Sequence, residues 1–149
     1  MISAAEAFGG LRSALEAAGV RYAVGGSWAS TAFGEPRLTN DVDILADFSP
    51  ATLDQFLGSL PSTYYADPEE ARAAIDRGRP FNVIHMPMAF KFDFFPARAF
   101  PLGVEELDRA IVLAGSGLSE LPTPFVTPED ILLAKLHWFR AGGEVSEVQ

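Results

Sequence analysis

The sequence contains no cysteine, which excludes disulfide frameworks, cysteine–zinc sites and thiol nucleophiles together. Histidine is almost as scarce: His85 and His137 are the only two, too few for a multi-histidine metal site. A metal ion would therefore be held mainly by carboxylates, which favours hard cations such as Mg²⁺. No apolar run approaches the ~18 residues of a membrane span, and no signal-peptide pattern opens the chain. These absences indicate a soluble, cytoplasmic protein with no membrane partner.

Positive charge is also scarce, since 11 basic residues face 20 acidic ones and the net charge is −9. Such a surface repels long nucleic acids but still permits a small anionic ligand in a local pocket. With 149 residues, of which 48% are hydrophobic, the chain is expected to form one domain over residues 1–149. Ser146 and Gln149 have capping-box spacing, so the sequence ends either on a fraying tail or where a longer protein would begin another helix.

Helical and strand patterns alternate along the chain, which predicts an α/β (α+β) fold with a mixed sheet and helices packed on it. The expected helices cover residues 3–18, 27–33, 50–57, 68–77, 104–107 and 128–140. The expected strands cover residues 21–24, 41–46, 81–86 and 90–95, the last two forming a hairpin, and one or two more strands are expected near residues 110–113 and 118–126.

The first candidate binding feature is the segment VGGSWAS, in which a strand runs through Gly25 and Gly26 to Ser27 and then into a helix. Glycines let a ligand approach the backbone, and a helix N-terminus presents unpaired N–H groups, so this turn suits a phosphate. The alternative is a tight turn in which Ser27 is an ordinary helix cap.

The second feature is TNDVDIL, a strand that places Asp41 and Asp43 on one face and Val42 and Ile44 on the other. Neighbouring carboxylates raise each other's pKa, and a divalent cation between them removes that penalty. Such acid pairs hold the metal ions of phosphoryl and nucleotidyl transfer. The alternative is a solvated acidic strand face.

The third feature is KFDFF, which places Asp93 among apolar and aromatic neighbours in a later strand. A carboxylate there needs a partner. It could complete a metal site as a third acid, accept a proton as a general base, or pair with Lys91 or an arginine at the rim of the site.

Taken in this order and spacing, the three features resemble the nucleotidyltransferase superfamily, which has the DNA polymerase β-like fold. The wording GGSWAS…FGEPRLTNDVDIL, together with TPEDILLAKLHWF, is similar to the minimal nucleotidyltransferases, which include AbiEii-like toxins, toxin-modifying antitoxins and small antibiotic adenylyltransferases. The resemblance spans residues 21–141.

The resemblance implies that Asp41, Asp43 and Asp93 are the catalytic acids. They would bind two Mg²⁺ ions, with Mn²⁺ as a substitute, and Asp93 would also serve as the base. One ion would activate the acceptor hydroxyl, and the other would steady the triphosphate.

The nucleotide-binding residues that the resemblance implies are Gly25, Gly26 and Ser27 at the phosphates, with Arg37 and Thr39 near the nucleotide or the acceptor. Lys135 follows from a separate argument. It lies on the last helix beside Ile131, Leu132 and Trp138, which are expected to be buried, so it should reach an anion or else extend from the edge of the apolar stripe.

The sequence therefore predicts a Mg²⁺-dependent transfer of a nucleoside monophosphate from an NTP to an acceptor, with release of pyrophosphate. The acceptor stays open between an RNA end, a protein side chain, as in a toxin–antitoxin pair, and a small molecule such as an antibiotic. The alternative is a catalytically inactive module of the same fold that binds a nucleotide or a partner protein.

Overall fold

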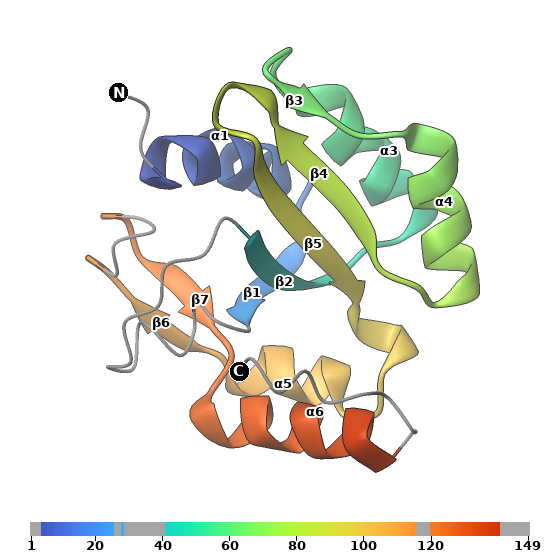
Figure 1. The fold of residues 1–149 in the computed structure, drawn as a ribbon, viewed down its shortest axis with the longest axis vertical. Coiled ribbons are helices and arrows are strands. Elements are labelled where there is room, and N and C mark those ends of the chain that lie inside the picture. Colours follow the sequence, from blue (N-terminus) through green and yellow to red (C-terminus); the bar gives the residue numbers. More distant parts are fainter. Residues whose placement is uncertain (1–3, 26–27, 29–40, 116–119, 141–149) are drawn as a thin grey trace.

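The computed structural model describes residues 4–25, 28, 41–115 and 120–140, and these form a mixed sheet with helices on both faces (Figure 1). The sheet has seven strands in the order β3-β4-β5-β2-β1-β7-β6, which confirms the predicted mixed α/β fold. The strands are β1 (Arg21–Gly25), β2 (Asp41–Asp47), β3 (Tyr64–Tyr65), β4 (Phe81–His85), β5 (Phe90–Pro96), β6 (Ile111–Leu113) and β7 (Thr123–Phe125).

The central strand of the sheet is β2. It runs antiparallel to β1 on one side and parallel to β5 on the other. The predicted hairpin is confirmed, because β4 and β5 pair antiparallel. The two-residue strand β3 pairs with β4 at one edge and was not predicted. Its two tyrosines are too short a run to show an alternation of apolar and polar residues.

The helices follow the predicted positions closely. At the start of α3, Ser49 and Thr52 form a capping box, and Asp67 caps α4 through the backbone N–H groups of Glu69 and Glu70. The predicted helix over 27–33 lies, apart from Trp28, outside the described residues. The helix bounds are α1 (Ala4–Ala17), α3 (Pro50–Ser59), α4 (Pro68–Arg77), α5 (Gly103–Arg109) and α6 (Pro128–Arg140).

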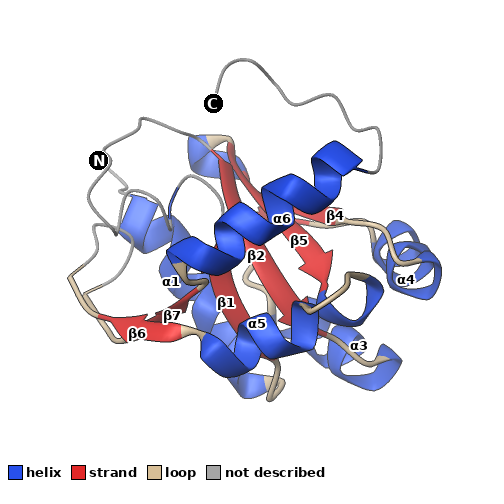
Figure 2. Ribbon diagram, turned by 90° about the horizontal axis from the view of Figure 1, so that it is seen from below, coloured by secondary structure: helices blue, strands red, loops and turns tan. Residues whose placement is uncertain are grey.

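The sheet separates two hydrophobic clusters. The larger one joins α1, α3 and α4 to one face of the strands and is rich in aromatic rings, with Phe81 stacked on Phe94 at 5.2 Å between ring centroids. The smaller one includes Leu45 of β2 and Leu107 of α5, on the opposite face. Figure 2 shows α5 and α6 together on this second face. No described helix is long and apolar enough to cross a membrane.

An ion pair links α5 to α6 on the second face. The Arg109 guanidinium donates to both carboxylate oxygens of Asp130, at 2.7 and 3.0 Å, and the Asp130 side chain is only 2% exposed. Two parallel N–H···O bonds fix both distance and orientation, so this pair anchors the start of α6. Glu106 is buried close by on α5.

Candidate active site

The alternation of β2 places its acids as the sequence predicts. Val42 and Ile44 are fully buried in the aromatic cluster, while Asp43 is half-buried and Asp41 is exposed. Because side chains alternate along a strand, Asp41 and Asp43 share the face on which Leu45 is covered by the smaller cluster. The carboxylates of Asp41 and Asp43 therefore lie beyond the end of the smaller cluster, on the same face of the sheet.

The neighbouring strands bring the other predicted residues beside Asp43. In the strand register Asp43 lies opposite Asp93 of β5 and also opposite Gly25 of β1. Asn82 of β4 lies opposite Asp93 in turn. Adjacent strands are about 4.8 Å apart, so these four positions form one row across the sheet. The predicted juxtaposition of Asp43 and Asp93 is thus a direct product of strand order.

The pKa values of Asp43 and Asp93 are raised by burial and by the nearby negative charges. Burial, together with the charges of Asp93 and Asp41, raises the pKa of Asp43 to about 6. Burial also raises the pKa of Asp93, and Asp41 adds to this rise while Lys91 opposes it. The site therefore concentrates negative charge that a cation would stabilise.

Lys91 is a cation beside the row, and it is the residue to which the resemblance gave no role. Its Nζ lies 3.5 Å from Asp93 Oδ2, and in the register it lies opposite Asp41. The pairing of Asp93 with Lys91 was one of the alternatives that the sequence left open, and it is present. The Lys-x-Asp spacing in a strand was the available signal, since residues two apart share a face.

The space around Gly25 is large enough to hold a side chain. A methyl group added there would meet Val126 Cγ2 at 3.6 Å and the Asp43 carbonyl oxygen at 3.9 Å, both ordinary contacts. Its φ is also outside the left-handed region. Because Gly25 is paired with Asp43, a side chain here would project onto the acid face. Neither local packing nor backbone strain therefore demands glycine at this position.

The remaining predicted residues are placed as follows. Gly26, Ser27, Arg37 and Thr39 lie outside the described residues. Lys135 is exposed on α6.

The expected burial on α6 is wrong for Leu132, which is 58% exposed. The side of α6 that packs against the rest of the protein carries Asp130 and Ile131. Asp130 forms the ion pair with Arg109 of α5, and Ile131 contacts both hydrophobic clusters. The burial argument for Lys135 therefore fails, and its role as a nucleotide contact stays a prediction.

The two histidines and Trp28 are not among the residues that line up beside Asp43 and Asp93. His85 is buried on the aromatic side of the sheet, edge-on to Tyr64 at 5.0 Å. His137 is exposed on α6. Trp28 packs against Phe90 with ring centroids 6.3 Å apart, as expected of a packing residue.

The donor chemistry of the row fits Mg²⁺. Asp41, Asp43 and Asp93 offer only carboxylate oxygens, which are the ligands that hard divalent cations prefer. The charges of Asp93 and Asp41 contribute to the raised pKa of Asp43, and the Lys91 ammonium lies 3.5 Å from Asp93. Within the described ranges, no three acidic or histidine side chains already converge closely enough to hold a metal ion. Holding an ion would therefore require these side chains to turn toward one another.

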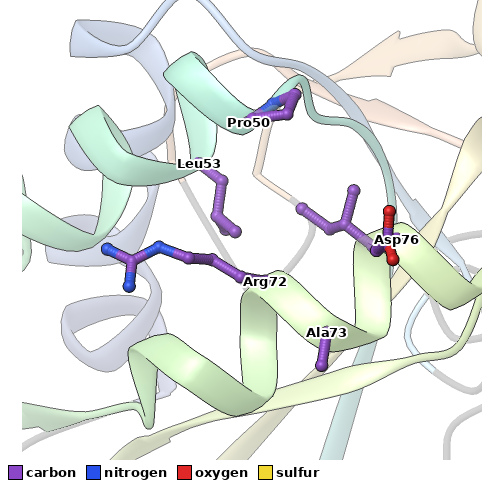
Figure 3. A pocket seen from close by; sticks show the side chains of 6 residues that line it. Pro50, Leu53, Arg72, Ala73 and Asp76 are labelled. Carbon is purple, nitrogen blue, oxygen red and sulfur yellow. The ribbon is translucent and has the colours of Figure 1, made fainter.

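A hollow of about 590 Å³ lies elsewhere, between α3 and α4 (Figure 3). Pro50 and Leu53 of α3 face Arg72, Ala73 and Asp76 of α4 across it. These helices cover the aromatic side of the sheet, so the hollow and the acids are on opposite faces. The Arg72 guanidinium already pairs with Asp54 at 2.9 Å. The hollow contains none of the predicted site residues.

Comparisons with known proteins add a structural likeness only. No protein-family model matches the chain, and no curated protein matches it. Among solved structures, the chain is similar to the lincomycin-bound crystal structure of the lincosamide antibiotic adenylyltransferase LnuA. The TM-score is 0.47 and the sequence identity 15%, over 95% of this chain and 89% of that chain.

Proposed function

We propose that this protein is a Mg²⁺-dependent nucleotidyltransferase of the minimal DNA polymerase β-like group. The observation that supports the proposal is the row of Gly25, Asp43 and Asp93 on three adjacent strands, with Asp41 on the same face of β2 as Asp43. The Gly-Gly-Ser segment begins at Gly25, so the triphosphate would lie beside the acids. The Gly-Gly-Ser segment, the acids of β2 and β5, and the mixed α/β fold all agree with this assignment.

The carboxylates of Asp41, Asp43 and Asp93 would hold the Mg²⁺ ions, which when bound supply positive charge to the triphosphate and to the acceptor oxygen. The acceptor hydroxyl oxygen forms a bond to the α-phosphorus of the NTP. The bond from that phosphorus to the bridging oxygen breaks, and pyrophosphate leaves. Asp93, whose pKa is raised by burial, accepts the hydroxyl proton on a carboxylate oxygen.

The acceptor that the charge balance favours is a small cationic molecule. The net charge is −9, and the row itself is acidic, so a cationic acceptor is attracted and a long RNA is repelled. An aminoglycoside is one molecule of that chemistry. RNA ends and a protein partner, including a toxin or antitoxin, are the competing acceptors that the experiment below separates.

The experiment is transfer of label from each α-labelled NTP, with Mg²⁺, to fractionated RNA, to cell protein and to a panel of aminoglycosides. We expect label in the aminoglycoside fraction with the wild type and none with Asp43→Ala. Asp76→Ala is the matched control, because Asp76 is an acid of α4 on the other side of the sheet. Label in RNA or protein would change the acceptor. Stabilisation by nucleotide without any transfer would favour the inactive binding module.

Lys91 is expected to compete with the metal ion. Removing its charge by Lys91→Met takes away one positive charge beside the acids, so divalent cations should bind more tightly. A unit charge at this range and partial exposure changes affinity roughly threefold or more. Titration calorimetry with Mn²⁺ measures the effect without any need for activity.

Lys91→Arg is the matched control for this prediction, since it keeps the charge and should keep the wild-type affinity. Weaker binding of Mn²⁺ to Lys91→Met than to the wild type would mean that Lys91 supports the metal site instead of competing with it.

A further inference from the structure

The outer side of α6 is an apolar surface in contact with water. Leu132, Leu136 and Phe139 follow one another at spacings of four and three residues and therefore share one side of the helix. They are 58%, 51% and 66% exposed, and Leu133 beside them is 45% exposed. The buried Asp130 and the half-buried Ile131 lie on the other side. We call Leu132, Leu133, Leu136 and Phe139 the outer face of α6.

This face is not what a solvated helix normally presents. A surface helix turns its apolar stripe inward and its polar stripe outward. Here α6 has an inward side held by the Asp130–Arg109 pair and a second, outward apolar side that no described residue covers. Contiguous exposed apolar residues of this kind mark interaction surfaces.

The charges that flank the outer face indicate which partner fits it. Glu129 and Arg140 are both exposed and stand at the two ends of the helix. They are eleven residues apart, about three turns or roughly 16 Å, so both lie on the same flank of the face. A copy of α6 laid antiparallel on this face would therefore place each Glu129 beside an Arg140 of the other copy.

The apolar residues obey the same symmetry. With Glu129 opposite Arg140, Leu133 of one copy lies opposite Leu136 of the other, and Leu132 lies close to Phe139. A two-fold interface needs this kind of self-complementary patch, in which residue i meets residue j and j meets i. Lys135 lies on the other flank, where its exposed, flexible side chain can extend into water.

We propose that the outer face of α6 is a two-fold dimer interface in which two copies of the chain pair their α6 helices antiparallel. Residues 141–149 are a poorer occupant, because Val145 and Val148 are their only large apolar residues. The proposal is independent of the nucleotidyltransferase reaction. An interface built on one short helix falls at the low end of the size range, so dissociation in the micromolar range is expected.

Sedimentation velocity over about 5–500 µM protein tests the proposal, a range set by the weak affinity expected of a small interface. The wild type should pass from monomer to dimer within this range, and Leu136→Glu should weaken dimerisation at least tenfold. Val112→Glu is the matched control, because Val112 is 62% exposed on the edge strand β6, outside the outer face. A wild type that stays monomeric throughout, or a dimer sensitive to Val112→Glu and not to Leu136→Glu, would overturn the proposal.

Charge reversal tests the antiparallel arrangement. Glu129→Arg alone and Arg140→Glu alone should each weaken the dimer severalfold, and the double variant should recover most of the loss. Thermal unfolding of each variant shows whether the monomer is still folded. A double variant no better than the singles contradicts the antiparallel pairing.

The absence of cysteine allows a direct second measurement. Leu136→Cys introduces the only thiol of the chain close to the proposed two-fold axis. Mild oxidation should convert it to a covalent dimer much faster than Val112→Cys. Equal rates of cross-linking would contradict the proposed axis.

Discussion

Replacing Asp43 by asparagine is expected to abolish nucleotidyl transfer and at the same time to make the metal-free protein more stable. Asp43 lies between Gly25 and Asp93 in the strand register, at the centre of the row that would hold the metal ions and the triphosphate. Loss of one metal-binding carboxylate removes several kcal/mol of transition-state stabilisation, so the rate should fall about a thousandfold or more.

The gain in stability follows from the pKa of Asp43. The folded protein raises that pKa from 3.8 to about 6, so the folded state binds protons more tightly than the unfolded state. Stability is therefore lost as the pH rises through this window, and at about pH 7.5 the ionised Asp43 opposes folding. The amide that replaces the carboxylate in Asp43→Asn carries no charge, and we expect the variant's free energy of unfolding to be about 1–2 kcal/mol higher than that of the wild type.

Asp47→Asn is the matched control, because Asp47 lies on the same face of the same strand but serves structure. Its carboxylate accepts two hydrogen bonds from Arg98, at 2.8 and 3.0 Å. This variant should keep its transfer activity and gain no stability. The measurements are label transfer and urea unfolding of both variants without metal. An Asp43→Asn protein that retains a tenth of the activity would contradict the proposed site.

Glu106→Gln is expected to remove a large pH dependence of stability. Burial raises the pKa of Glu106 to about 7, and the nearby charge of Asp130 adds to the rise while Arg109 opposes it. Because the folded pKa is above the ordinary value of 4.5, the folded state holds the extra proton between about pH 4.5 and 7. The wild type should lose stability across this window as the pH rises, on the order of 2–3 kcal/mol from this group.

The expected result is a difference between two unfolding curves. At about pH 4 the wild type and Glu106→Gln should have similar free energies of unfolding, because Glu106 is then mostly protonated in both the folded and the unfolded state. At about pH 8 the variant should be more stable by the amount given above. Glu105→Gln is the matched control, since Glu105 is a more exposed acid on the same helix. Wild-type and Glu106→Gln curves that stay parallel between these two pH values would show that Glu106 is not buried next to Asp130.

The sequence predicted most of this fold because its signals are local. Caps and prolines define α3 and α4, and alternating burial defines β5 and the first half of β2. The juxtaposition of Asp43 with Asp93 was also predictable, since the resemblance supplied the order of strands that local signals cannot give. Asp93 and Lys91 share a face by simple alternation, and their pairing was among the alternatives.

Apart from the short strand β3, the misses are matters of tertiary contact. The periodicity of α6 indicates an amphipathic helix but does not say which side is held inward, and the ion pair of the buried Asp130 with the half-exposed Arg109 of α5 made that choice. Leu132 was therefore expected to be buried and is exposed. Glu106 gave no signal in the sequence either, because a helical glutamate is usually solvated and only burial beside Asp130 makes it a titrating group near neutral pH.

The position of the acids on adjacent central strands has a consequence for how such a protein can change its substrate. The backbone separation of Asp43 and Asp93 is set by the hydrogen-bonded spacing of β2 and β5, about 4.8 Å. A change in that backbone separation would require a different pairing of β2 and β5 and a rearrangement of the larger hydrophobic cluster that packs on them. Under the proposed function, substitutions around the row could therefore change the acceptor while the backbone spacing of Asp43 and Asp93 stays the same.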